Sequence, residues 1–407
     1  MKRTIIFTSV LIFLSAFVSG ALAQEIKVGT LLAHTGPLKE FGPAIKNGTE
    51  LAAKQMADAG FKIKLIHEDS ETSAIPALNA AKKLVEIDKV VGIVGALSSG
   101  VTVPVAESVT CPKGVILISP ASTSPLLTVL PSDQKKDFLF RTCPSDALQG
   151  VVAGRLGATY NKTASVLYVN NPYGQGLAEQ FKRSFEKRGG KVLAMVPHDE
   201  KTAESYAPEL RKALEKNPDI LCAFSYPQHA TIYLKDAIEF FKFKKFLFCD
   251  GTKSVDILKA IGAENLEGQK GTAPGTAGGE PFVIFSADYK TEYGELPPLP
   301  FITNGYDGAA VIGLAAYAAK VKGLPLTSEN IRDQLRYVAN PPGEIIKPGE
   351  FKKAFALLKE GRDINYEGAA GSVDFDKNGD VITPIEVWKY ADGKIVTVSM
   401  EYDIPAE

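Results

Sequence analysis

The chain has 407 residues, 45% of them hydrophobic and 23% charged, and its 46 basic and 47 acidic residues give a net charge of −1. This balance, with both signs interspersed, excludes a basic surface for nucleic acid or for an anionic membrane. The length allows two domains with substantial cores, since one domain takes about 100–200 residues.

The first residues follow the three-part pattern of a secretory signal peptide. Basic residues open the chain (MKR), a mostly apolar run follows over 5–18, and an Ala-Leu-Ala cleavage motif ends at Ala23. The apolar run is too short for a membrane span of about 20 residues. We therefore expect residues 1–23 to be cleaved off near Ala23 and the mature chain to be periplasmic.

Strands and helices then alternate through the first third of the chain. Apolar runs without strict alternation are typical of strands buried on both faces of a parallel sheet, and amphipathic helical segments lie between them. The predicted strands are 26–32, 61–69, 90–94, 114–118 and 138–142, and the predicted helices are 41–60, 76–87 and 101–109.

The same alternation returns in the middle of the chain. The predicted strands there are 164–170, 191–197, 219–225 and 244–249, and the predicted helices are 176–190, 205–217 and 229–242. Two such series predict an α/β fold with two doubly wound, parallel-sheet lobes.

The last third of the chain does not continue the alternation of strands and helices. The glycine- and proline-rich stretch 271–281 is predicted to be a loop that does not continue a sheet. Four helices follow, and because they need a sheet to cover, we assign them to the first lobe. The tail, 373–400, is predicted to form strands joined by tight turns. The predicted helices are 282–294, 306–321, 328–339 and 350–359, and the turns are Asn378-Gly379 and Asp392-Gly393.

The resulting division makes the chain cross between the lobes three times. The first boundary falls near Thr142–Asp146. Residues 24–143 plus 276–382 form the first lobe, and 144–275 plus 383–407 form the second. Three crossings make a hinge, and lobes that close about a hinge leave a cleft for a ligand.

Four cysteines, an even number in an exported chain, allow three disulfide pairings. Cys111 precedes the predicted strand 114–118, and Cys143 lies at the end of the next predicted strand, 138–142. Cys222 and Cys249 lie in consecutive predicted strands. We therefore expect disulfides 111–143 and 222–249. The alternative is four reduced, buried thiols. Their spacing, with no CxxC and no nearby histidine pair, does not indicate a metal site.

Small hydroxyl-bearing residues end two neighbouring strands of the first series. ALSSG places Ser98 and Ser99 between a strand and a helix, and ISPASTSP places Ala121, Ser122 and Thr123 after the next strand. Ligands of open α/β sheets bind at the carboxyl ends of strands, where hydroxyls and free N–H groups suit a carboxylate. The alternative for the first motif is simple helix capping by serine.

Three strand ends of the second series carry larger polar side chains. Tyr173 follows one strand, Tyr226 the next, and Asp250 and Thr252 a third. Aromatic bodies with polar tips are typical of a cleft wall that packs against a ligand and orients it.

Other chemistries fit the sequence poorly. ALSSG has Ala96 where the nucleophile elbow of hydrolases has glycine, and neither His198 nor His229 comes with an orienting acid pattern. The 271–281 loop lacks the phosphate-loop spacing. The stretch 374–380 resembles the start of a calcium loop but has isoleucine at the position where glutamate is needed. We expect no enzyme, no cofactor and no metal.

Taken together, these stretches resemble the periplasmic binding proteins of branched-chain amino acid ABC transporters, which have the type I fold. The resemblance covers nearly the whole mature length through IKVGTLLAHTGPLKEFGPAIKNGTELA, VVGIVGALSSG, GVILISPASTSPLLT, FLFRTCPSDALQG, NNPYGQGLAEQF, GYDGAAVIGLAAYAA, NPPGE and DINYEGAAGSVDFDKNGD. No single motif is specific, but their order and spacing are.

The resemblance implies roles for several residues. The carboxylate of the ligand would be held by Ser98 and Ser99 and by Ala121 and Thr123, and the aromatic wall would be Tyr173, Tyr226 and, from the first lobe, Phe41. Family members that bind hydrophobic amino acids hold the ammonium with a glutamate after the strand written KKFLFC here. This chain has Asp250, Gly251 and Thr252 instead, which leaves the ligand's identity open.

We expect a monomeric periplasmic receptor that captures a small amino acid, branched-chain or otherwise aliphatic, and delivers it to an ABC transporter permease. The alternatives are an amide or a small aromatic carboxylic acid as ligand, a sensory rather than a transport role, and a periplasmic hydrolase.

Overall fold

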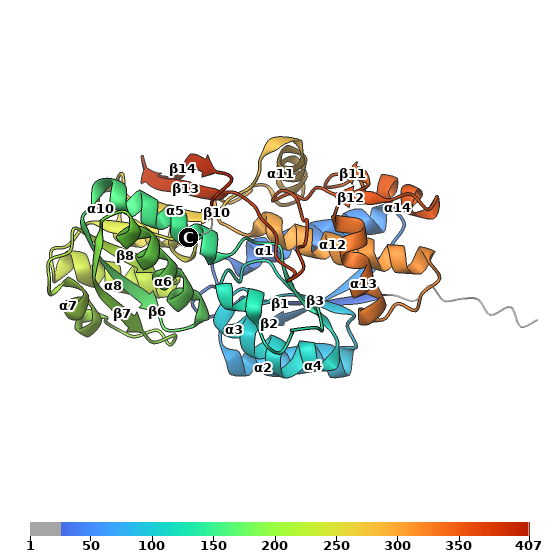
Figure 1. The fold of residues 1–407 in the computed structure, drawn as a ribbon, viewed down its shortest axis with the longest axis horizontal. Coiled ribbons are helices and arrows are strands. Elements are labelled where there is room, and N and C mark those ends of the chain that lie inside the picture. The colour runs from blue at the N-terminus through green and yellow to red at the C-terminus, as the bar shows by residue number, and fades with distance from the viewer. Residues whose placement is uncertain (1–25, 406) are drawn as a thin grey trace, which may run out of the picture.

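The computed structural model describes residues 26–405 and residue 407, so the predicted signal peptide lies outside the described residues. Two lobes lie side by side, each built around its own sheet (Figure 1). None of the helices in the described part of the chain combines the length and hydropathy that a membrane span needs. The α/β fold with parallel sheets that the sequence predicts is confirmed.

The first sheet has five parallel strands in the order β2-β1-β3-β4-β5. Alternate residues of its strands belong to different hydrophobic clusters: Ile116 and Ile118 point to one, and Leu117 to the other. Both faces are therefore covered, which is why its strands lack a polar face. The strands are β1 (Ile26–Leu32), β2 (Ile63–Asp69), β3 (Gly92–Gly95), β4 (Ile116–Ser119) and β5 (Leu139–Arg141).

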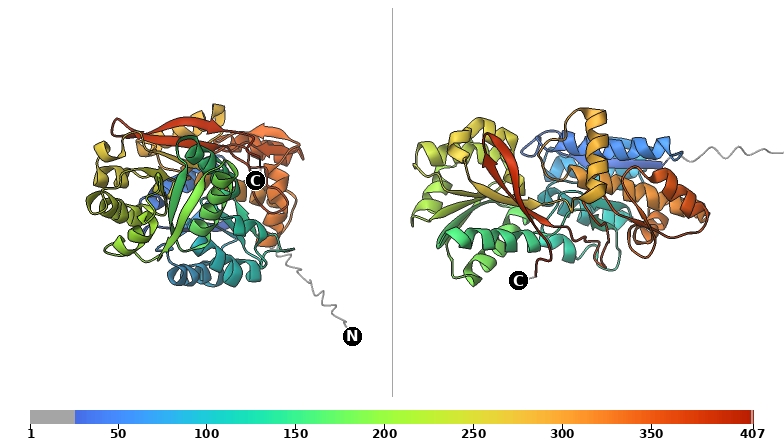
Figure 2. Two further views of the ribbon diagram at one scale, coloured as in Figure 1. Left: turned by 60° about the vertical axis from the view of Figure 1, so that its left-hand side comes forward. Right: turned by 90° about the horizontal axis from the view of Figure 1, so that it is seen from above.

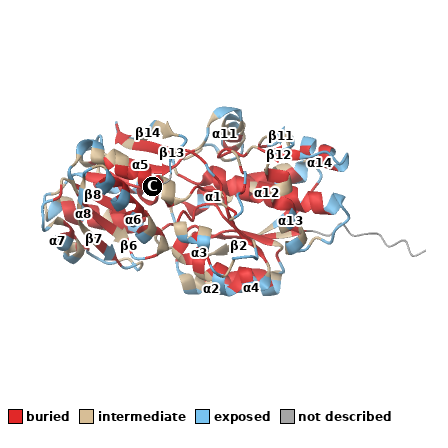
Figure 3. Cartoon of the chain, viewed as in Figure 1, coloured by how far each residue is buried: buried red, intermediate tan, exposed pale blue. Residues whose placement is uncertain are grey.

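The long helix α12 (Ile302–Val321) dominates one face of this sheet and is buried over most of its length (Figure 3). It packs on α1 (Gly42–Asp58) at close range, because a Cβ at Gly48 or at Gly305 would lie 2.6 Å from an atom of the partner helix. Other elements of this lobe are α2 (Ala74–Lys82), η1 (Lys83–Asp88), α3 (Ser99–Val105), η2 (Ala106–Thr110), α4 (Cys111–Lys113), η3 (Pro125–Val129), α11 (Gly279–Tyr293), α13 (Ser328–Ala339), β11 (Glu344–Ile346), α14 (Phe351–Lys359) and β12 (Ile364–Tyr366).

The second sheet has seven strands in the order β14-β13-β10-β9-β8-β6-β7, with parallel pairing from β7 to β10 and an antiparallel hairpin at the other edge. Its strands are β6 (Thr163–Val169), β7 (Lys191–His198), β8 (Ile220–Phe224), β9 (Phe246–Phe248), β10 (Lys270–Pro274), β13 (Ile385–Ala391) and β14 (Lys394–Glu401). Its helices are α5 (Asp146–Tyr160), α6 (Pro172–Lys187), α7 (Ala207–Leu214), α8 (Pro227–Glu239), η4 (Asp250–Thr252), α9 (Val255–Ile261) and α10 (Ala263–Leu266).

The C-terminal third of the chain runs along one lobe and then reaches the other, where the β13–β14 hairpin joins the second sheet (Figure 2). Near this crossing the buried guanidinium of Arg141 pairs with Asp380 at 2.7 Å. The backbone N–H of Arg141 also donates to the carbonyl of Gly379. This contact ties the last crossing to the end of β5.

Two predictions about loops and turns are wrong. Residues 271–274 of the predicted loop belong to β10, an interior strand between β9 and β13. Glycine is required there because a Cβ at Gly271 would lie 2.5 Å from the Trp388 ring. The Asn378-Gly379 turn is present but no strands flank it, whereas the Asp392-Gly393 turn does join β13 to β14. The sequence pattern also did not predict α5 (Asp146–Tyr160).

The predicted disulfides are absent, since all four cysteines are free and buried. Cys111 and Cys143 belong to different hydrophobic clusters, and the Cys111 thiol donates to Asp133. The register of β8 and β9 places Cys222 opposite Leu247 rather than opposite Cys249. Burial raises the pKa of Cys111 to about 12, so its thiol stays protonated. Reduced, buried thiols, the alternative left open by the sequence, are what the structure shows.

Candidate functional site

The two hydroxyl-rich strand ends of the first lobe lie against each other. The hydroxyl of Ser98 caps α3 by accepting the N–H of Gly100, and the hydroxyl of Ser99 accepts the N–H of Ser124 at 3.2 Å. The capping role left open for Ser98 is thus real. Both serines also line the cavity between the lobes, so capping and ligand binding are compatible here.

The four residues of the ASTS stretch have four different environments. Ala121 lines the cavity, and the hydroxyl of Ser122 bonds to Thr102 and to the carbonyls of Ala96 and Leu97. In addition, the hydroxyl of Thr123 donates to a carboxylate oxygen of Asp146, and that of Ser124 donates to the carbonyl of Pro172 in the other lobe. Only part of the expected hydroxyl surface therefore faces the cavity; the rest holds the loop in place.

A buried arginine also binds the same loop. The guanidinium of Arg141, fully buried, donates to the carbonyls of Ser122 and Ser124 at 3.4 and 3.0 Å. Because Arg141 is itself held by Asp380, the last crossing of the chain helps to position the loop that lines the cavity.

The aromatic wall of the second lobe has the expected two members. The rings of Tyr173, at the start of α6, and Tyr226, just before α8, stack with centroids 5.5 Å apart. The Tyr226 hydroxyl lies 2.7 Å from the Ser98 hydroxyl, which joins the two lobes across the cleft. A residue that sequence reasoning missed, Asn171, donates to the Tyr226 oxygen and caps α6 by accepting two backbone N–H groups.

Asp250 is 3% exposed and lines the cavity beside Tyr173. The Tyr173 hydroxyl and the Gln149 amide both donate to its carboxylate, at 2.7 and 2.8 Å. Burial raises the pKa of this carboxyl group, against the lowering effect of these two donors. Thr252 is outside the cavity lining: its hydroxyl accepts the Cys249 N–H and donates to the Ala223 carbonyl.

These side chains surround one small cavity between the lobes. Phe41 contributes the first-lobe aromatic ring, and apolar groups complete the wall. The empty space amounts to about 280 Å³, and it is lined by Leu38, Phe41, Leu97, Ser98, Ser99, Ala121, Tyr173, Tyr226, Asp250, Gly251 and Phe301. The arrangement offers hydroxyls from one lobe, and phenols with an acid from the other, around an apolar middle. It suits a small ligand with an anionic end, an apolar body and a polar or cationic end.

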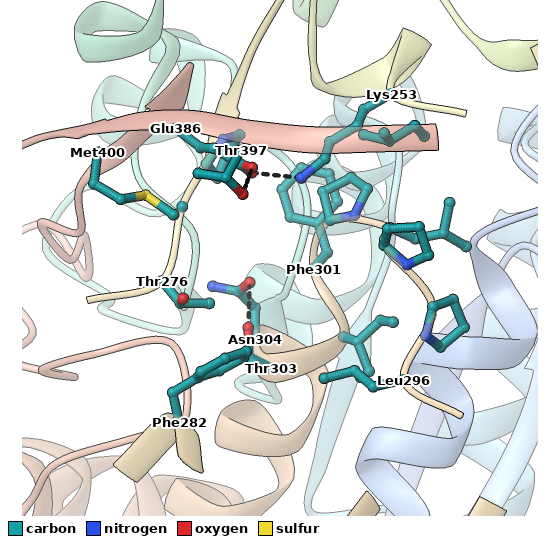
Figure 4. A pocket seen from close by; sticks show the side chains of 18 residues that line it. Lys253, Thr276, Phe282, Leu296, Phe301, Thr303, Asn304, Glu386, Thr397 and Met400 are labelled. Carbon is teal, nitrogen blue, oxygen red and sulfur yellow. Dashed lines mark hydrogen bonds and ion pairs between the residues drawn. The ribbon is translucent and has the colours of Figure 1, made fainter. Parts of the chain in front are cut away.

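A second cavity, shown in Figure 4, has about 800 Å³ of empty space, and Phe301 lines both cavities. It contains the buried ion pair of Lys253 and Glu386, whose carboxylate also accepts the hydroxyl of Thr397 at 2.6 Å. Because its acidic and basic groups already pair with each other, this cavity offers a ligand fewer free charges than the cleft.

At the rim of the cleft, a glutamate of the first lobe reaches the second. The carboxylate of Glu40 accepts the N–H groups of Val255 and Asp256, at 2.8 and 3.2 Å, and the hydroxyl of Ser254. These three groups form the start of α9, where unpaired N–H groups favour an anion. Glu40 therefore acts as a contact between the lobes, and nothing in the sequence pattern singled it out.

The two histidines of the second lobe form a buried network around Ser225. The Ser225 hydroxyl lies 2.7 Å from Nε2 of His198 and 3.3 Å from Nδ1 of His229. Burial lowers the pKa of His198 to about 4 and that of His229 to about 3. Ser225 itself is fully buried, so no substrate reaches this serine and the network has a structural role.

Comparisons with known proteins agree with this geometry. The chain is 26% identical over 391 residues to a chemotactic signal transduction system substrate-binding protein, BasB, of Halobacterium salinarum, covering 92% of this chain and 89% of that protein. It is 34% identical over 197 residues to a Leu/Ile/Val-binding protein homolog of Brucella melitensis. That match covers 47% of this chain and 51% of the relative.

Solved structures of low sequence identity share the fold. A leucine-binding protein of Thermotoga maritima has a TM-score of 0.76 at 23% identity, covering 93% of this chain and 99% of that one. A branched-chain amino acid transporter substrate-binding protein of Streptococcus pneumoniae in complex with isoleucine has a TM-score of 0.75 at 22% identity, and the match covers 94% of this chain and 100% of that one. A solute-binding protein of R. palustris in complex with benzoate has a TM-score of 0.72 at 18% identity, and the match covers 94% of this chain and 99% of that one.

A sequence profile described as "Periplasmic binding protein" matches residues 25–393, nearly the whole described chain. Members of this family bind solutes and are not enzymes. The chain belongs to the family of periplasmic binding proteins, with the type I fold of its branched-chain amino acid members.

Proposed function

We propose that this protein is a periplasmic receptor that binds a small aliphatic amino acid between its lobes and delivers it to an ABC transporter permease. One observation carries the proposal. A single cavity brings the hydroxyls of Ser98 and Ser99 opposite the carboxylate of Asp250, so that both ends of a zwitterion find a partner. The apolar body of the ligand would contact Phe41 and the stacked tyrosines.

Ligand binding would favour closure because the ligand contacts both lobes. Ser98, Ser99 and Ala121, with nearby N–H groups, would hold the carboxylate from the first lobe. Thr123, whose hydroxyl donates to Asp146, would instead hold the loop in position. From the second lobe, Tyr173, Tyr226 and Asp250 would contact the rest. A ligand shifts an equilibrium only by its differential affinity for the two states, and contacts from both sides provide that difference. Closure then offers the permease a surface composed of both lobes.

The division of the chain remains part of the proposal: residues 24–143 plus 276–382 form one lobe, and 144–275 plus 383–407 form the other. Packing of α12 on α1 and against β3 and β4 supports it, as does pairing of β13 with β10. We also propose export, with cleavage near Ala23, which the signal-peptide pattern supports.

A thermal-shift screen of purified, ligand-stripped mature protein tests the function. At 100 times its dissociation constant, a ligand should stabilise the fold by about 2.7 kcal/mol. We expect leucine, isoleucine or valine to raise the melting temperature and Asp250→Ala to abolish the shift. Thr252→Val is the matched control, because its hydroxyl lies outside the cavity. A shift with aromatic acids alone would refute the amino-acid ligand and leave the receptor.

A second candidate is a sensory receptor of the same fold. The BasB relative, which matches over most of both chains, is named for chemotactic signal transduction. A pull-down of the ligand-bound protein with solubilised permease, against a solubilised chemoreceptor, distinguishes the two roles.

A further inference from the structure

Asn171 and Glu200 form a hydrogen-bonded pair beside the aromatic wall of the cleft. Asn171 is buried and Glu200 half-buried, and neither lines the cavity. Nδ2 of Asn171 donates to Oε1 of Glu200 at 2.6 Å and to the Tyr226 oxygen at 3.0 Å. Its Oδ1 accepts the backbone N–H groups of Tyr173 and Gly174. Every donor and acceptor of this amide is therefore used, and its nitrogen faces Tyr226.

Glu200 is held in this position from both lobes. Its backbone carbonyl lies 3.0 Å from Nε2 of His229, a fully buried residue of the second lobe. Across the cleft, its carboxylate lies against Gly100 at the start of α3, where a Cβ would overlap Oε1. Because a carboxylate only accepts hydrogen bonds, Glu200 requires the nitrogen of Asn171, and not its oxygen, on this side.

The hydroxyls of Ser98 and Tyr226 together have one hydrogen more than their mutual bond uses. Their oxygens lie 2.7 Å apart, so one of the two hydroxyl hydrogens makes the bond between them. Both oxygens also accept a bond, Ser98 from the N–H of Gly100 and Tyr226 from Asn171. In the described part of the chain, neither hydroxyl has another hydrogen-bond partner. Whichever hydroxyl donates to the other, one hydrogen remains, and both residues line the cavity.

We propose that Asn171 and Glu200 set the direction of the hydrogen bonds at the ligand site, so that the Ser98–Tyr226 pair donates to the ligand and selects a carboxylate there. This inference rests on the proposed function and adds two positioning residues that do not touch the ligand. A donor gains most from an anionic acceptor. A ligand that offers only a donor at this place would leave two donors facing each other, each without a partner.

Exchanging the two side-chain types reverses the direction. The double variant Asn171→Asp/Glu200→Gln has the same total charge as the wild type. The new aspartate still caps α6, and the new glutamine donates to it. The aspartate has no hydrogen for the Tyr226 oxygen, so Tyr226 donates to the aspartate and Ser98 donates to Tyr226. No hydroxyl hydrogen then remains for the ligand.

Calorimetry at pH 7 with leucine and with leucinol, which has a hydroxymethyl group in place of the carboxylate, tests this reversal. We expect the double variant to bind leucine about 10- to 150-fold more weakly than the wild type does, the range for one hydrogen bond to a charged group. Leucinol can itself donate, so its affinity should stay within about threefold. Asn171→Asp alone should lower the preference for leucine over leucinol in the same way, and it supplies the measurement if the double variant does not fold.

Glu204→Gln is the matched control, since Glu204 is an exposed glutamate of the same loop, and it should bind both compounds as the wild type does. Melting temperatures without ligand establish that each variant folds. Leucine binding by the folded double variant at the wild-type affinity would overturn the inference and leave the receptor. An equal loss of leucine and leucinol would show a merely structural role and overturn it too. Failure of the wild type to bind any aliphatic amino acid would instead refute the proposed function, and the inference with it.

Discussion

The contact of Glu40 with the start of α9 should contribute to ligand affinity although Glu40 lies outside the cavity lining. Its carboxylate accepts two backbone N–H groups and one hydroxyl from the opposite lobe. These bonds exist only when the lobes are together. Hydrogen bonds to a charged group contribute about 1.5–3 kcal/mol net each. Glu40→Gln keeps one carbonyl acceptor but loses the charge, so closure should weaken by about the value of one such bond.

Because binding and closure are coupled, this loss appears as weaker binding, by about 10- to 150-fold at constant pH 7. Calorimetry with leucine gives the affinity, and small-angle scattering of the ligand-bound variant shows whether more of the open form is present. Glu71→Gln, an exposed glutamate of the same lobe, is the control and should bind as the wild type does. A Glu40→Gln affinity within twofold of the wild type would refute the reasoning.

Two further predictions concern stability, and a third concerns the cysteines. His198 and His229 have folded-state pKa values of about 4 and about 3, below their ordinary 6.5. Below pH 6.5 the unfolded chain therefore binds more protons than the folded chain. The free energy of unfolding should fall by about 1.4 kcal/mol per histidine for each unit by which the pH is lowered between 6.5 and about 4. Urea titrations across this range measure that slope, and a flat profile would contradict it. Gly271→Ala places a methyl group against Trp388 and should lower stability by about 1–3 kcal/mol in the same assay. Protein purified without reductant and unfolded in guanidinium should react with a thiol reagent at all four cysteines; two or no reactive thiols would mean that disulfides form.

Local pattern was sufficient for most of the fold. The run IKVGTLL is apolar on both faces and forms β1 over the predicted residues, and SENIRDQLRYVA forms α13 over the predicted ones. The strand β10 could not be found in this way. Its sequence, KGTAP, has little strand propensity, and it is a strand because β9 and β13 supply hydrogen bonds on its two sides.

The site was predictable where it depends on strand ends. Tyr173, Tyr226 and Asp250 each follow a strand of one parallel sheet, and carboxyl ends of parallel strands share an edge, so their convergence could be expected. Asp146 and Gln149 could not be predicted, because they lie on a helix that the pattern did not reveal.

The sequence by itself determined the elements, their alternation, and the polar residues that follow each strand, since all three depend on interactions within a few residues. Only the tertiary structure decided which side chains meet. Glu40 lies some 215 positions from α9 in the chain, at Val255, and touches it only because three crossings bring the lobes together. Register, likewise, set Cys222 opposite Leu247 and left the thiols unpaired. Such contacts depend on how whole sheets and lobes are placed, and no local pattern contains that information.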